Sequence, residues 1–172
     1  MFKYLWLSLI FFFCAYLGII RGRTYVNRHK NLSEVNKYML ILQNEILYKN
    51  TPLPEALKEL SFRSEEYFSK IFSQVSDDLI SGNKYTAYDS FKEIYKEYKE
   101  EFYFTKEDEK VIGDFLKVLG ESGLYGQEKI FELLKTNIET NLKDALEVSK
   151  KNSKLYSYLG VLTGAMIVIF LI

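Results

Sequence analysis

The chain of 172 residues has few of the residues that carry enzyme and metal chemistry. It contains one cysteine, Cys14, and one histidine, His29, so it forms no intrachain disulfide and offers no set of histidine and cysteine ligands for a metal. No nucleophile is paired with a histidine in a recognisable motif, and no glycine-rich phosphate-binding loop is present. We therefore predict no catalytic residue, no metal site, no cofactor and no enzyme activity.

Neither sign of charge predominates. The 23 lysines and arginines balance the 23 aspartates and glutamates, so the chain has no strong positive field with which to hold nucleic acid. The tyrosines between residues 85 and 103 therefore suit helix packing better than base stacking. Acidic stretches at 77–78 and 107–109 could hold a divalent ion, but such stretches more often form a solvated helix face. We predict no nucleic-acid partner.

Helix breakers are scarce as well. The only two prolines, Pro52 and Pro54, lie close together, and the sequence between the two ends is rich in glutamate, lysine and leucine. Apolar residues recur there at helical spacing, without the alternation that is typical of strands. The composition predicts an all-α protein.

What the chain does have is an uncharged apolar segment at each end. Residues 4–20 and 155–172 carry no charge, and helices of these lengths would each cross about 26 Å of hydrocarbon. Membrane-spanning helices have about 17–25 residues, and both segments reach that range with their flanks. A cleaved signal peptide is the alternative for the first segment, but basic residues follow it and no small-residue cleavage site ends it. We predict an N-terminal transmembrane helix with its basic flank at 1–23, a cytoplasmic helical bundle at 24–154 and a C-terminal transmembrane helix at 155–172.

Basic residues flank the middle of the chain on both sides and determine the predicted topology. They are Arg21, Arg23, Arg28 and Lys30 after the first segment, and Lys150, Lys151 and Lys154 before the second. Because basic flanks stay on the cytoplasmic side of a membrane, the middle is predicted to be cytoplasmic. The lipid bilayer is then a partner of both ends, and both termini face away from the cytoplasm.

Capping signals divide the middle into about six helices. The candidate starts are Asn31 with Glu34, Thr51 with Pro52, Ser64, Thr86 with Asp89, Thr105 with Asp108, and a last start near Gln127. Short loops between these helices predict an antiparallel, up-and-down bundle. No proline or glycine occurs from Glu128 until Gly160, so we expect the last helix to continue into the second apolar segment. The first helix is expected to continue from the first segment, although Gly22 and Asn27 weaken that pattern.

Two glycines in the second apolar segment indicate helix packing. Gly160 and Gly164 are four residues apart, so they lie on one helix face and allow another helix to approach closely. We expect this face to pack on the first segment near Ala15 and Gly18, or on a partner protein. The alternative is that glycine is simply common in membrane helices.

Two acidic residues at the expected tips of the bundle are candidates for partner contact. Glu121 lies in the stretch Gly120–Gly123, which predicts a helix stop and restart and could also expose a charged contact. Glu55 follows Pro54 at the start of a predicted helix. Helix capping explains an acid at that position nearly as well.

Two parts of the sequence, taken together, resemble a known family. Leu42–Tyr48 leads into Thr51–Leu57, and Leu116–Gly123 is followed, after two further residues, by Gly126 and Gln127. With this length and an apolar segment at each end, the chain resembles the stage III sporulation protein AB family of endospore-forming bacteria over nearly its whole extent. Residues 85–104 carry little of the resemblance. That family is in turn similar to the cytoplasmic domain of the F-type platform protein of type II secretion and type IV pilus systems.

The resemblance implies a role in sporulation. It implies a component of the channel between mother cell and forespore, in the membrane around the developing spore and in contact with other membrane proteins of that channel. It also implies a partner, the cytoplasmic secretion-type ATPase stage III sporulation protein AA, whose motion the bundle would couple to the membrane. The residues leave open a membrane-anchored scaffold without an ATPase partner, a small pore, or an enzyme acting on membrane lipids. Uncharged spans and missing catalytic groups argue against the last two.

Overall fold

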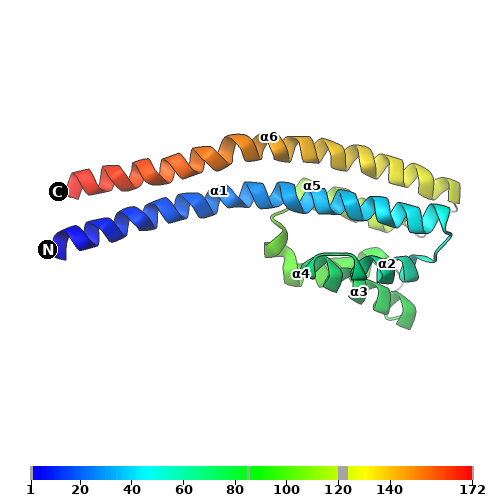
Figure 1. Cartoon of the computed structure of the whole chain (residues 1–172). Coiled ribbons are helices and arrows are strands. Elements are labelled where there is room, and N and C mark those ends of the chain that lie inside the picture. The colour runs from blue at the N-terminus through cyan, green and yellow to red at the C-terminus, as the bar shows by residue number, and fades with distance from the viewer. Residues whose placement is uncertain (1, 85, 120–123, 172) are drawn as a thin grey trace. The chain divides into compact units, whose positions relative to one another are not determined.

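The computed structural model describes residues 2–84, 86–119 and 124–171, and the regular structure in these ranges is helical throughout (Figure 1). In chain order the elements are α1 (Phe2–Gln43), η1 (Asn44–Tyr48), α2 (Leu53–Phe62), α3 (Glu66–Ser81), α4 (Ala87–Phe102), α5 (Lys106–Val118) and α6 (Leu124–Leu171). The element η1 is a π-helical turn, and the others are α-helices. The predicted all-α fold, with a long apolar helix at each end, is confirmed.

The two terminal helices are long and unbroken. α1 has 42 residues and α6 has 48, so the first and last predicted helices of the middle are continuous with the apolar ends. The predicted capping box at Asn31 and Glu34 is therefore wrong, because α1 is already helical before it reaches Asn31. A capping box marks a helix start only where no helix precedes it. At the other end, α6 begins at Leu124, three residues before the expected start.

The chain forms two compact units. The first contains residues 1–30 and 142–172, and its described residues belong to α1 and α6; we call it the paired-helix unit. The second contains residues 31–141, and we call it the bundle unit. Both long helices contribute residues to each unit.

In the paired-helix unit, α1 and α6 lie side by side and run antiparallel (Figure 1). Gly164 lies against Phe11. Gly22, eleven residues later in α1, lies against Ser153, eleven residues earlier in α6. Both helices are long and apolar enough to cross a membrane by length and composition, and only 17% of the apolar window in α1 and 11% of that in α6 is buried. They differ in this from the core helices of a soluble protein, and they fit membrane anchoring.

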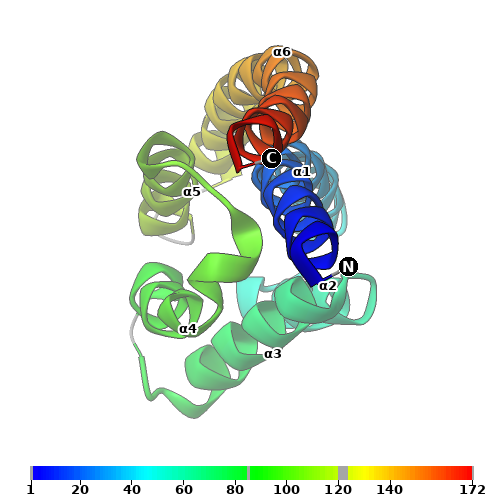
Figure 2. The ribbon, with the colours of Figure 1, turned by 90° about the vertical axis from the view of Figure 1, so that its left-hand side faces the viewer.

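In the bundle unit, α2 packs on α3, α3 on α4 and α4 on α5 (Figure 2). The core of this unit is aromatic. Phe68 of α3 and Phe102 of α4 meet edge to face with ring centroids 4.7 Å apart, and Tyr38 of α1 contacts Phe68 at 5.0 Å. Edge-to-face contact is a favoured geometry between aromatic rings. The aromatic residues at helical spacing are thus largely packing residues of the bundle.

Local sequence signals account for the ends of α3, α4 and α5. The backbone N–H of Asp89 donates to the Thr86 hydroxyl at 3.1 Å, as the predicted cap of α4 requires. Thr105 and Asp108 form the predicted reciprocal capping box of α5. Gly82 ends α3 with φ of 73°, in the left-handed region that glycine enters without strain.

Two predicted caps are wrong. Pro52 occupies the N-cap position of α2, and the Thr51 hydroxyl lies 3.4 Å from the Glu45 carboxylate instead. The Ser64 hydroxyl donates back to the Leu60 carbonyl oxygen at 2.7 Å and does not cap α3. In both cases the side chain bonds to the element before it, which a forward-looking capping pattern does not reveal.

Candidate functional site

Unusual backbone is concentrated in the turn between η1 and α2. The five residues of η1 have π-helical geometry, and Asn50 has a φ of 54°, which is positive for a residue other than glycine. Asparagine tolerates this left-handed region better than most residues. The two prolines of the chain, Pro52 and Pro54, lie two and four residues after Asn50. Because π-helical turns occur frequently at functional sites, we treat this turn as the candidate functional site.

The buried residue Glu45 makes the contacts that hold the turn together. Its side chain is only 5% exposed, and its carboxylate accepts a hydrogen bond from the Lys49 ammonium group at 2.7 Å. Its backbone carbonyl oxygen accepts from the Thr51 N–H at 2.9 Å, and the Arg63 guanidinium lies 4.0 Å from its carboxylate. The bond from Lys49 keeps the pKa of the Glu45 carboxyl below its ordinary value. The carboxylate therefore stays charged and keeps its partners in place at neutral pH.

α3 supports the beginning of α2. The Ser76 hydroxyl, which is fully buried, donates to the Pro54 carbonyl oxygen at 2.7 Å. One turn further along α2, the Lys58 ammonium group lies 2.8 Å from the Asp77 carboxylate of α3. These bonds fix the first turn of α2 against α3, so its exposed side chains project from a fixed backbone.

Glu55 lies on the exposed side of this first turn. Within the residues that the structure describes, no ion pair involves its carboxylate. Tyr48, at the end of η1, is 76% exposed, which is unusual for an aromatic side chain and common at protein interfaces. The other predicted contact, Glu121, lies outside the described residues.

Glycines bring α1 and α6 into backbone contact within the paired-helix unit. A Cβ atom on Gly160 would lie 2.8 Å from the Cys14 carbonyl oxygen and 2.9 Å from the Gly18 Cα. A Cβ on Gly164 would lie 3.2 Å from the Cys14 Cβ, and one on Gly22 would lie 2.8 Å from a backbone oxygen of α6. Gly18 and Gly22 have the same spacing of four residues as Gly160 and Gly164, a signal in the sequence that our prediction did not use.

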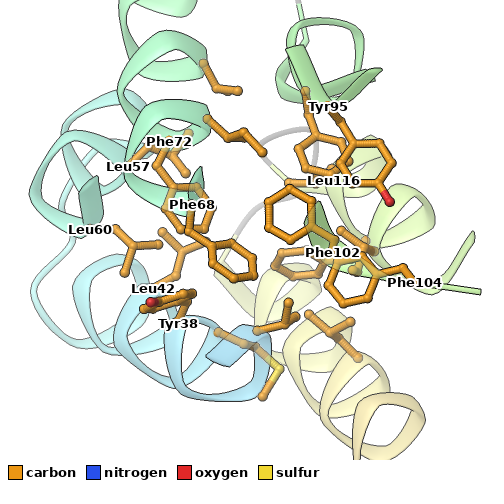
Figure 3. Close-up of a pocket in the computed structure, with 18 residues that line it drawn as sticks. Tyr38, Leu42, Leu57, Leu60, Phe68, Phe72, Tyr95, Phe102, Phe104 and Leu116 are labelled. Atoms are coloured by element: carbon orange, nitrogen blue, oxygen red, sulfur yellow. The ribbon is translucent and has the colours of Figure 1, made fainter. Parts of the chain in front are cut away.

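The bundle unit has an apolar cavity of about 70 Å³ (Figure 3). Phe68, Phe102 and Leu57 are among the side chains around it. Tyr38 also lines it, and burial raises the pKa of its phenol to about 12, so this group stays neutral. Such a lining suits neither a charged ligand nor a polar cofactor. Among the described residues, no group of three or more histidine, cysteine, aspartate or glutamate side chains is placed to hold a metal ion.

The family of this chain follows from its similarity to known proteins. A family model described as stage III sporulation protein AB matches residues 3–172, which is nearly the whole chain. The chain belongs to the stage III sporulation protein AB family. The resemblance seen in the sequence is thereby confirmed.

Two relatives of this stage III sporulation protein AB family member extend the match. Stage III sporulation protein AB of Bacillus subtilis (strain 168) is 26% identical over 157 residues, which cover 91% of each chain. A solved structure of stage III sporulation protein AB (SpoIIIAB) is 24% identical, with a TM-score of 0.64, and the match covers 72% of this chain and 97% of that one. At 24% identity, this structural similarity supports the helical fold of the chain and nothing further. The names of these relatives refer to a stage of sporulation and to no reaction.

Proposed function

We propose that the protein is a membrane-anchored, non-enzymatic component of the channel between mother cell and forespore, with its bundle unit in the cytoplasm of the mother cell. In this proposal it couples a cytoplasmic secretion-type ATPase, stage III sporulation protein AA, to the membrane proteins of the channel. The observation that carries the proposal is the unbroken course of α6, which contributes to the bundle unit and contains a candidate membrane span. Membership of the sporulation family supplies the biological setting.

An unbroken helix is a suitable element for transmitting movement along the chain. A helix resists bending unless proline, glycine pairs or a π-helical bulge interrupts it, and α6 is α-helical over 48 residues. We expect Leu142→Pro to abolish sporulation while the protein remains membrane-bound and abundant, because proline kinks a helix interior. Normal spore formation with this variant would contradict transmission through α6.

The turn between η1 and α2 is our proposed contact surface for the ATPase. Glu55 and Tyr48 are exposed there on a backbone that Glu45 and α3 hold in place. An exposed acid and an exposed aromatic ring on the same segment are suited to a partner surface that offers a lysine or arginine and an apolar patch. Glu121 remains a second proposed contact.

A binding experiment with purified proteins tests the proposal. The full chain in lipid nanodiscs is titrated with purified stage III sporulation protein AA, and binding is measured for the parent chain, Glu55→Arg and Glu121→Arg. Glu97→Arg is the matched control, since Glu97 is an exposed acid on α4. We expect charge reversal at Glu55 to weaken binding at least tenfold and the control to bind as the parent does.

The other outcomes are equally informative. Unchanged binding by Glu55→Arg and Glu121→Arg would place the contact elsewhere. No binding of the ATPase by a folded parent chain would favour the alternative function, a membrane-anchored scaffold of another complex without an ATPase partner.

A further inference from the structure

The corner between α4 and α5 is bonded to both long helices. α4 ends at Phe102, Tyr103 follows with a φ of 56°, and α5 begins after the cap at Thr105. The rings of Phe102 and Phe104 stack with centroids 5.4 Å apart, which packs the corner on itself. One asparagine from α1 and one from α6 reach this segment within the bundle unit.

Asn31 binds the end of α4. Its side-chain amide donates to the carbonyl oxygen of Glu101 at 3.1 Å and to that of Phe102 at 2.9 Å. The last carbonyl groups of a helix have no partner inside it, so this amide satisfies two acceptors that would otherwise need water. The residue that the sequence suggested as a cap for its own helix thus caps the C-terminus of another.

Asn141 binds the beginning of α5. Its side-chain amide donates to one carboxylate oxygen of Asp108 at 2.9 Å. The other oxygen of Asp108 accepts from the backbone N–H of Thr105 at 2.9 Å and from its hydroxyl at 2.8 Å. Asp108 is fully buried and Asn141 is 9% exposed, so these bonds are shielded from water. A buried carboxylate is stable only when its oxygens have such partners.

The two asparagines lie where the long helices enter and leave the bundle unit. Asn31 is the residue at which α1 enters the bundle unit, and Asn141 is the last residue of α6 in that unit. A segment of eight residues, 101–108, therefore bonds to both long helices at their limits in the bundle unit. The two asparagines are 110 positions apart in sequence, and only the fold brings them to the same corner.

We propose that the α4–α5 corner is a brace that holds α1 and α6 to each other at this level, with Asn31 and Asn141 as its positioning residues. With the brace intact, a displacement of the bundle moves both long helices together. With either bond lost, the parts of α1 and α6 that lie in the bundle unit are no longer fixed to each other through the corner. The brace itself is a property of the bundle unit, and its use in transmitting movement rests on the function proposed above.

A distance measurement between the two long helices tests the brace without any partner protein. Spin labels are placed at exposed positions of the bundle unit, through Ser33→Cys on α1 and Glu139→Cys on α6, in a full chain carrying Cys14→Ala and held in lipid nanodiscs. We expect one narrow distance distribution for this background. Asn31→Leu and Asn141→Leu should each broaden it, and the double variant should be no broader than either single variant.

Control and rescue variants separate a brace from general loss of structure. Asn36→Leu is the matched control, because Asn36 is another asparagine of α1 and its buried side-chain oxygen has no hydrogen-bond partner among the described residues. It should leave the distribution narrow. Asn141→Asp should broaden it, since two carboxylates then face each other. Adding Asp108→Asn to Asn141→Asp restores a donor and an acceptor in exchanged places, and it should narrow the distribution again.

Two results would overturn the proposal. One is a narrow distribution in both Asn31→Leu and Asn141→Leu. The other is failure of the exchanged pair to restore the narrow distance while circular dichroism shows the parent helix content. Neither result depends on ATPase binding, so a failed brace and a failed coupling function are distinguishable.

Discussion

The two units of this protein pack their helices by different chemistry. In the paired-helix unit, α1 and α6 approach closely at glycines, and at Gly18, Gly22 and Gly160 the neighbouring atoms are backbone atoms of the other helix. In the bundle unit, the contacts are between large side chains such as Phe68 and Phe102. Lipid tails are as apolar as the side chains that they surround, so helices in a membrane gain little from hiding apolar surface and gain from close approach. In water, burial of apolar surface is the strongest driving force for packing.

Exposure of phenylalanine side chains shows the same difference. Phe102 in the bundle unit is 2% exposed, whereas Phe12 in the paired-helix unit is 66% exposed. A large apolar side chain therefore stabilises the bundle unit through its contacts, whereas in the paired-helix unit it suits the lipid surroundings that these two apolar helices fit. Substitutions of one chemical type should therefore have different consequences in the two units.

The largest expected effect is from Phe102→Ala. Its ring contacts the rings of Phe68, Tyr95 and Phe104, and its removal from a packed core should lower the free energy of unfolding by about 3–5 kcal/mol. Phe12→Ala is the matched control and should change it by less than about 1 kcal/mol. Thermal unfolding of both variants in nanodiscs, followed by circular dichroism, measures the difference. Equal losses in the two variants would contradict the comparison.

Features of the fold that depend on residues close together in sequence were predictable, and features that depend on distant residues were not. The cap at Thr86 and the box at Thr105 and Asp108 were predictable because they are complete within four residues. Asn31 carries a similar local pattern, but its amide bonds to residues 70 and 71 positions away. No short-range pattern contains that information. The all-helical class and the long terminal helices were predictable because they depend on composition and on the absence of breakers.

The candidate site was predictable only in part. The two prolines predicted a turn before Glu55, and the structure places this residue on the exposed side of that turn. The π-helical turn before it could not be predicted, because Glu45 is held by contacts that include Arg63 of a later segment. Contact of Glu55 with a partner remains a prediction, as does packing of Gly160 and Gly164 as a functional feature.

A glycine-to-alanine substitution, which adds one methyl group, should change stability differently in the two units. In Gly160→Ala the new Cβ would meet backbone atoms of α1 at 2.8 and 2.9 Å, so the two helices must separate, at a cost of about 1–3 kcal/mol. In Gly113→Ala, inside α5, the nearest atom is at 3.1 Å on the Tyr88 side chain, which can move. Alanine also favours a helix over glycine by about 1 kcal/mol. Gly113→Ala should therefore leave stability unchanged or raised, as measured by the same unfolding experiment.

Gly82 provides a smaller effect with a different cause. It has open space around it, so no clash opposes a side chain, but its φ of 73° does. Gly82→Ala should cost about 1 kcal/mol because alanine is strained in the left-handed region. Gly82→Asn should cost less, since asparagine tolerates that region. If the two variants lose equal stability, conformation is not the reason for this glycine.

The smallest effect concerns the pH dependence of stability and compares the glycine contacts with the turn that contains Glu45. The glycine contacts of the paired-helix unit are made by backbone and carbon atoms, whereas the turn between η1 and α2 depends on the charged Glu45 carboxylate. The pKa of Glu45 is lowered mainly by its hydrogen bond from Lys49, so its stabilising effect is present above the unfolded pKa of about 4.3. That effect is lost as pH falls through the lower, folded pKa.

The chain should therefore be more stable than Glu45→Gln at pH 7, and the difference should shrink as pH falls from about 5 to about 3. Other acids titrate in both proteins and cancel in this difference. Unfolding temperatures of the two proteins, measured side by side across that range, give the result. A difference that stays constant down to pH 3 would mean that Glu45 supports the turn by shape and hydrogen bonding alone. Its charge would then contribute nothing to holding Glu55 in place.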